Sequence, residues 1–179
     1  QHLSAGLIGA ILFDLTLDKK LSIDGKFLKP LVSGVKADDA HGIILKKILE
    51  REKPRKIKNW VSRLNTKSRK YRFMIFEEME RKRLVSVERK KFLFIPYKVA
   101  RLRDIKNRNK LMGDLRSLVL NKKRLNDENA ALLSLAYACK MHKILGKNKE
   151  ENKKIKTQLK DILNQSAISG EVDKVIKEM

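Results

Sequence analysis

Apolar residues recur at intervals of three and four along most of the chain, which is the spacing of helices that bury one face. In the first run, Leu3, Leu7, Ile11 and Leu15 follow one another every four residues and predict a helix over 3–17. The same spacing and its flanking cap and stop residues predict further helices over Ile43–Arg51, Lys56–Leu64, Val99–Asn121, Asp127–Leu145, Lys153–Leu163 and Gly170–Met179. The pattern therefore predicts a mainly helical fold.

Two segments change to the alternation of apolar and polar residues that is typical of β-strands. Lys20–Leu28 has Asp24-Gly25 as a two-residue turn. Leu84–Ile95 is the second segment, and its turn is expected at Glu88–Lys91, which carries a net positive charge. We therefore expect the fold class to be mainly α, with residues 1–179 forming a single globular helical domain that carries two small β-hairpins.

The stretch Thr66–Ile95 organises the chain, and its first two-thirds has the pattern of a helix. Three residues with side chains suited to an N-cap lie at its start: Asn65, Thr66 and Ser68. Apolar side chains occupy two of its faces, which predicts a mostly buried helix. These side chains are Tyr71, Phe73, Ile75, Phe76 and Met79.

Arg69 and Arg72 lie one turn apart near the N-terminus of this helix, and they share a face. Basic residues there oppose the helix dipole, and a bound anion would relieve that conflict. We therefore take Arg69 and Arg72 as a candidate phosphate-binding pair. The alternative is that each pairs with an Asp or Glu from elsewhere. Five further basic residues would add diffuse attraction to an anionic membrane: Lys67, Lys70, Arg89, Lys90 and Lys91.

The charge of the chain is concentrated in its middle. The net charge is +22, and residues 51–124 carry +19 of it, with 26 Lys and Arg against 7 Asp and Glu. Segregation of this kind is typical of proteins that meet a polyanion, such as nucleic acid, anionic lipid or an acidic partner. A requirement for solubility alone does not predict it.

The residues that carry catalytic or metal chemistry are few and scattered. Cys139, which is the one cysteine, lies in an apolar run and is expected in the core with Trp60 and Leu135. The three histidines have no metal-ligand spacing, and no phosphate-binding glycine loop or nucleophile–base pattern is present. We expect no enzyme activity, no cofactor and no metal. The helix over 3–17 is too short to span a bilayer, and no basic region precedes it to suggest a signal peptide.

The second hairpin allows several interpretations. Phe92 and Phe94 follow the lysines, and they would insert into a membrane, pair with another subunit, or pack on the core as an ordinary wing. Two helices followed by a basic hairpin also resemble a winged helix in outline, and the charge suffices for nucleic acid. Nucleic-acid binding is therefore the alternative to membrane binding.

The order of motifs resembles the Golgi phosphoprotein 3 family over nearly the whole chain. Leu3–Leu17 resembles the small-residue-rich helix of the family, and Lys58–Leu64 resembles its Asn-Trp helix. Arg69-Lys-Tyr-Arg72 matches the Arg-x-x-Arg motif, and Arg83–Val85 with Lys91–Phe94 matches the second hairpin.

The resemblance implies a peripheral membrane protein that binds phosphatidylinositol 4-phosphate and retains glycosyltransferases as an adaptor. The expected place is cytoplasmic, on a membrane surface, and the cytosolic face of the Golgi if the source is eukaryotic. Arg69 and Arg72 match two residues of the family's lipid pocket, whereas its helix arginine falls on Ile8 and its Trp would precede residue 1. With these departures, the chain resembles a divergent or prokaryotic member of the family. Expected partners are phosphoinositide-like lipid, cytosolic tails of membrane proteins and a second copy through the second hairpin.

Overall fold

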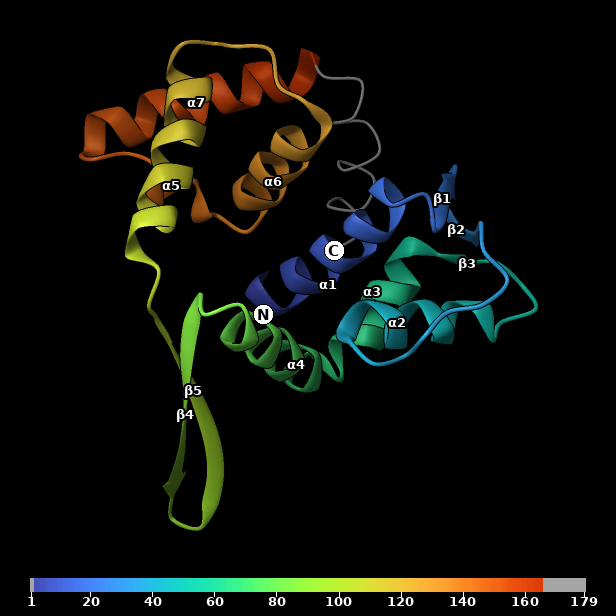
Figure 1. The fold of residues 1–179 in the computed structure, drawn as a ribbon. Helices are drawn as coiled ribbons and strands as arrows, with labels where there is room; N and C mark the ends of the chain where they lie inside the picture. Colours follow the sequence, from blue (N-terminus) through green and yellow to red (C-terminus); the bar gives the residue numbers. More distant parts are fainter. Residues whose placement is uncertain (1, 166–179) are drawn as a thin grey trace.

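Two hydrophobic cores organise the helices (Figure 1). The computed structural model describes residues 2–165. The helices of the first core are α1 (His2–Leu17), α2 (Ala40–Leu49), α3 (Ile57–Asn65) and α4 (Ser68–Arg81). Those of the second are α5 (Ile105–Leu120), α6 (Asp127–Ala138) and α7 (Lys149–Gln165). The predicted mainly helical fold with two small β-hairpins is confirmed.

Helix α1 lies at the centre of the first core. Ile8 and Ile11 are fully buried, and they belong to the same cluster as Trp60 of α3 and Tyr71 of α4. The predicted core position of Trp60 is confirmed, since 2% of its surface is exposed. Helix α2 begins three residues earlier than the apolar spacing predicts, because the Asp39 carboxylate accepts a hydrogen bond from the Gly42 N–H at 2.6 Å and caps the helix.

The second core is built around Leu133 of α6 and Ile155 and Leu159 of α7, whose side chains are fully buried. An ion pair between Arg116 and Glu151 also joins α5 to α7. Helix α6 contacts α1 and so connects the two cores.

Helix α6 ends at Ala138, so the predicted helix through Leu145 is wrong in its second half. Lys140 has φ 57°, a left-handed conformation that stops a helix, and a 3-10 helix η1 (Met141–Ile144) follows. Because the helix ends there, Cys139 is only partly buried, although Leu135 is buried as expected. The helix is capped by Asn126, whose side chain accepts a hydrogen bond from the Asn129 N–H at 2.8 Å.

Helix α7 begins at Lys149 and not at Lys153, because the Asn148 side chain accepts a hydrogen bond from the Glu151 N–H at 2.8 Å. The helix predicted over Gly170–Met179 lies outside the described residues.

The first hairpin is the edge of a three-stranded antiparallel sheet. Its strands are β1 (Leu21–Asp24), β2 (Phe27–Pro30) and β3 (Arg55–Lys56), in the order β1-β2-β3. Asp24 pairs with Phe27, so the turn residues are Gly25-Lys26 and not the predicted Asp24-Gly25. Gly25 has φ +60°, which is the left-handed conformation that glycine adopts without strain.

The second hairpin is longer than predicted and its turn lies elsewhere. Strands β4 (Val85–Phe92) and β5 (Ile95–Leu102) pair antiparallel, from Val85 with Leu102 to Phe92 with Ile95. The turn is therefore Leu93-Phe94, and the segment Glu88–Lys91 that was predicted to form it lies within β4. Because the strand continues through Leu102, α5 starts at Ile105 and not near Val99. The hairpin projects away from the helices (Figure 1).

Candidate functional site

Three basic side chains converge on the ring of Phe73 in α4. The guanidinium carbons of Arg69 and Arg72 lie 5.5 and 5.7 Å from the ring centroid, and the Lys98 ammonium of β5 lies 5.3 Å from it. Arg69 also donates a hydrogen bond from Nη2 to the Pro96 carbonyl at 3.0 Å. The ring and the hairpin backbone therefore orient the two arginines side by side.

Neither arginine is neutralised by an acid in the part of the chain that the structure describes. The ion pairs there include neither Arg69 nor Arg72, and both side chains are exposed. The alternative prediction, that each arginine pairs with an Asp or Glu, is therefore wrong for the described residues. Glu77 instead pairs with Lys98, and that hydrogen bond holds the pKa of Glu77 below its ordinary value. Most donors of the two guanidinium groups remain available to an anion.

The start of α4 differs from the prediction in its cap. Lys67 occupies the N-cap position and makes no capping hydrogen bond with its side chain. Thr66 is used at the end of α3, where its hydroxyl donates to the Arg63 carbonyl at 2.8 Å. The first turn of α4 contains no acidic residue. This end of the helix therefore presents uncapped N–H groups beside two arginines, which favours a bound anion.

Helix α4 is also less buried than its two apolar faces predict. Tyr71 is its one buried side chain within the described part, and Phe73 is half-buried beneath the basic groups. The prediction of a mostly buried helix is wrong because one face of α4 lies against the hairpin and not in the core.

The auxiliary basic residues divide between two faces of the hairpin. Side chains alternate along a strand, so Arg89 and Lys91 project from the same face as Lys98, which pairs with Arg89. Lys90 projects from the other face and pairs with Glu88 at 3.0 Å. Lys67 and Lys70 are exposed at the start of α4. Lys98 was not among the predicted residues, and a hairpin turn placed correctly at Leu93-Phe94 would have revealed its position opposite Arg89.

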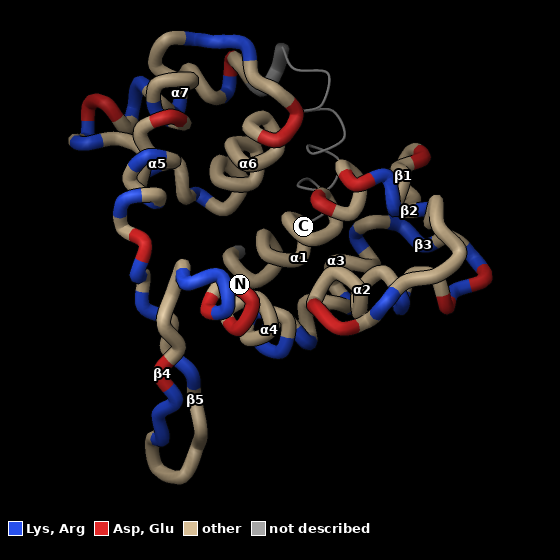
Figure 2. Tube along the Cα trace, viewed as in Figure 1, with Lys and Arg blue, Asp and Glu red and all other residues tan. Residues whose placement is uncertain are grey.

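The hairpin tip is apolar and exposed. Phe92, Leu93, Phe94 and Ile95 expose 66%, 74%, 97% and 61% of their surfaces, so the interpretation of the phenylalanines as a wing packed on the core is wrong. Figure 2 shows the uncharged tip beyond strands that carry Lys and Arg. Leu93 and Phe94 have φ 44° and 70°. These are left-handed conformations that two-residue turns normally give to Asn and Gly.

Comparison with protein-family models decides the family. The model of Golgi phosphoprotein 3 (GPP34) matches residues 1–179. The chain belongs to the Golgi phosphoprotein 3 family. A comparison with curated protein sequences finds no significant match. None of the helices within residues 2–165 is long and apolar enough to cross a bilayer.

One position of this Golgi phosphoprotein 3 family chain departs from the lipid pocket that the resemblance implies. Ile8, which stands where the helix arginine was expected, is fully buried in the first core. A cation there would be buried without a partner, so this core requires an apolar residue. Of the pocket residues that the resemblance implies, the described chain therefore has Arg69 and Arg72 at matching positions.

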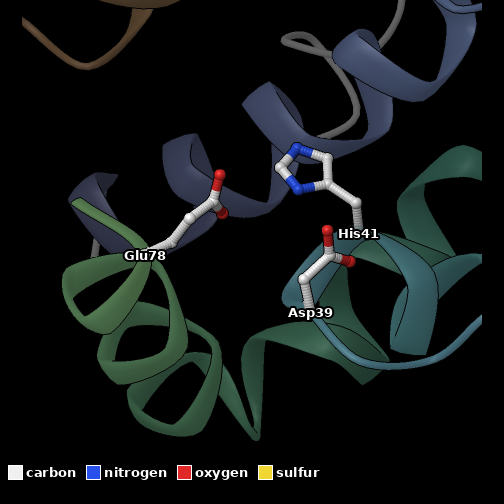
Figure 3. Close-up of side chains that lie close together, drawn as sticks. All are labelled: Asp39, His41 and Glu78. Carbon is white, nitrogen blue, oxygen red and sulfur yellow. The ribbon is translucent and has the colours of Figure 1, made fainter. Parts of the chain in front are cut away.

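A second polar cluster joins α1, α2 and α4 and was not predicted. His41 Nε2 lies 3.1 Å from the Asp14 carboxylate, and Figure 3 shows a ring nitrogen turned toward Asp39 and Glu78. The hydrogen bond with Asp14 raises the pKa of His41, with smaller contributions from the charges of Asp39 and Glu78 and an opposing effect of burial. A protonated imidazole among three carboxylates therefore fits the site.

The same cluster has the composition of a metal site. The ligand atoms of Asp39, His41 and Glu78 lie within 4.8 Å of one another. The contacts of the described residues satisfy these groups without an ion, because Asp39 caps α2 and Lys82 pairs with Glu78 at 2.7 Å. We therefore interpret the cluster as a polar connection between three helices.

Proposed function

We propose that this chain is a peripheral membrane module that binds anionic lipid headgroups. Phosphatidylinositol 4-phosphate is the lipid that its family indicates. One observation carries the proposal: Arg69, Arg72 and Lys98 converge on Phe73 beside a hairpin with an exposed apolar tip. Arginine pairs suit phosphate because their planar forks donate two hydrogen bonds each.

The hairpin supplies a second contact in this proposal. Arg89 and Lys91 on its strands lie near the headgroups, and each basic residue close to an anionic leaflet contributes about 1 kcal/mol. The apolar tip then enters the interface between headgroups and acyl chains. Affinity for DNA comes mainly from contacts with phosphates, whereas the four exposed apolar side chains at this tip match acyl chains, so the tip favours a membrane.

The further roles follow from the family and have no residue assigned to them. We propose residues 1–179 as one module without enzyme activity, located on the cytosolic face of a membrane, which is the Golgi in a eukaryotic source. Its protein partners would be cytosolic tails of membrane proteins such as glycosyltransferases. A second copy of the chain, joined through the hairpin tip, is the competing use of that tip.

Paired substitutions at Arg69 and Arg72 test the headgroup site. Sedimentation would compare phosphatidylcholine vesicles containing either phosphatidylinositol 4-phosphate or phosphatidylserine at equal surface charge. Replacing both arginines with Lys keeps the charge but removes the fork, so selectivity for the phosphoinositide should fall more than total adhesion. Replacing both with Ala should abolish selectivity and lower the melting temperature only slightly, because the exposed contacts with Pro96 and Phe73 are lost but no carboxylate of the described chain loses a partner.

The matched control is Arg103→Ala with Arg108→Ala, which removes two exposed arginines outside α4 and the hairpin. It should weaken adhesion to both vesicles equally. If the arginines are structural, the double Ala variant at Arg69 and Arg72 melts at a lower temperature while its lipid preference persists. Retardation of duplex DNA that is stronger than vesicle binding at matched salt would favour the nucleic-acid alternative.

A further inference from the structure

A cleft of about 610 Å³ opens between the first sheet and the start of α3. Six of its lining residues are basic and none is acidic: Lys26, Arg51, Lys53, Arg55, Lys56 and Lys58. They come from three places, which are the β1–β2 turn, the segment after α2 and the strand β3 that leads into α3. The fold therefore collects these charges from separate parts of the chain.

Five of the six cations of the cleft make no ion pair with an acid within residues 2–165. Arg51, Lys53, Arg55, Lys56 and Lys58 take part in none of the ion pairs of the described residues. Arg55 lies over the Trp60 ring at 5.5 Å. Desolvation lowers the pKa of Arg55, and repulsion from Arg51 and Arg63 adds to the effect. Like charges held together in a concave site repel one another, and a bound anion would relieve that repulsion.

The backbone at the start of α3 is also suited to an anion. Lys56, at the N-cap, makes no capping hydrogen bond with its side chain, and the first turn contains no acidic residue. Lys58 and Asn59 belong to that first turn and line the cleft. The Ile57 N–H at this helix start donates to the Lys26 carbonyl at 2.8 Å, and the N–H groups that follow it in the first turn lack intrahelical partners and attract negative charge. The basic side chains and the positive end of the α3 dipole thus both attract an anion into this cleft.

We propose that this cleft is a second anion site, which binds a small ligand bearing two or more phosphate groups. Its volume is within the range of small-ligand sites, and the number of its cations exceeds what one phosphate neutralises. It is distinct from the Arg69 and Arg72 pair, since the nine residues of α3 separate the two by roughly 13 Å along the helix. Figure 1 shows β3 well apart from the β4–β5 hairpin. The inference does not depend on the proposed function.

Titration calorimetry of the full chain with inositol hexakisphosphate, at physiological salt, tests the proposal. The cleft variant replaces Arg51, Lys53 and Lys58 with Gln; all three are exposed and take part in none of the ion pairs of the described residues. The control replaces Arg108, Lys106 and Lys110 with Gln and therefore loses the same charge from α5. We expect the cleft variant to bind at least about tenfold more weakly than the wild type, because several charge-assisted hydrogen bonds are lost. The control should bind within about twofold of the wild type, through the general effect of charge.

A second arm separates the sources of the phosphate groups. Vesicles of phosphatidylcholine with phosphatidylinositol bisphosphate would be tested with the same variants and with Arg69→Gln, Arg72→Gln. Loss of vesicle binding by the cleft variant alone supports a lipid headgroup in the cleft. Loss of inositol hexakisphosphate binding alone supports a soluble ligand. Equal losses in the cleft and control variants would overturn the proposal, as would a cleft variant impaired only in binding duplex RNA or DNA.

The double Gln variant at Arg69 and Arg72 keeps the two proposals separable. If it binds inositol hexakisphosphate as the wild type does, the ligand occupies the cleft and not the α4 site. If it loses that binding while the cleft variant keeps it, the cleft proposal is overturned and the α4 site is supported.

Discussion

Replacing Leu93-Phe94 with Asn-Gly should stabilise the protein and weaken its binding to membranes at the same time. Both residues adopt left-handed conformations, with φ 44° and 70°, in a turn that favours Asn-Gly. A left-handed conformation costs an L-residue with a Cβ about 1–2 kcal/mol. The two side chains expose 74% and 97% of their surfaces, so little burial within the fold is lost. We expect the free energy of unfolding to rise by about 1–2 kcal/mol.

The effect on membrane binding has the opposite sign. Fully burying a Leu or Phe side chain is worth about 1.5–3 kcal/mol, so partial insertion of both contributes about 3 kcal/mol. Their removal should therefore reduce the vesicle partition coefficient by roughly a hundredfold. Urea unfolding and vesicle sedimentation on the same preparation would measure the two effects. Leu31→Ser is the matched control, since Leu31 is 57% exposed and lies outside the β4–β5 hairpin.

Three outcomes would contradict this reasoning. A more stable Asn-Gly variant with unchanged vesicle binding would show that the tip does not enter the bilayer. A less stable variant would show that the apolar pair supports the fold. If analytical ultracentrifugation without lipid shows that the wild type is dimeric and the variant monomeric, the tip is instead a contact between subunits.

Three further predictions concern other parts of the molecule. Gly6→Ala should lower the free energy of unfolding, because a Cβ there would overlap the Cys139 Sγ. Adding Cys139→Ala should restore most of that loss. If urea unfolding shows no such rescue, the contact between Gly6 and Cys139 is contradicted. The Asp14 contact raises the pKa of His41, so its stabilisation is fully present below the ordinary value of 6.5 and is lost as pH rises through the higher folded value. The difference in melting temperature between the wild type and Asp14→Asn should accordingly shrink above that pH, and a constant difference would exclude the linkage. Vesicle binding should also weaken steeply as salt rises, because exposed charges are screened over about 8 Å at physiological ionic strength, whereas binding unchanged in molar salt would mean that insertion dominates.

The local pattern of the sequence was sufficient for the helices and for the position of the candidate arginines. Apolar spacing placed α1 and α3, and it identified Trp60 as a core residue. That Arg69 and Arg72 lie about one turn apart on the same face follows from helix geometry alone. The family is recognisable from the order of the same motifs, and the family model confirms it. These features depend on residues close together in the chain, whose relation a regular backbone determines.

Tertiary structure alone decided which residues surround those arginines. Lys98 reaches Phe73 only because β5 pairs with β4 in one register, and the basic run in β4 obscured the true turn at Leu93-Phe94. The His41 cluster and the cleft beside α3 each join segments distant in sequence, such as Asp14 with Glu78 or Lys26 with Lys58. Local periodicity holds no information about such pairings, because they depend on how separate elements pack to bury their apolar faces.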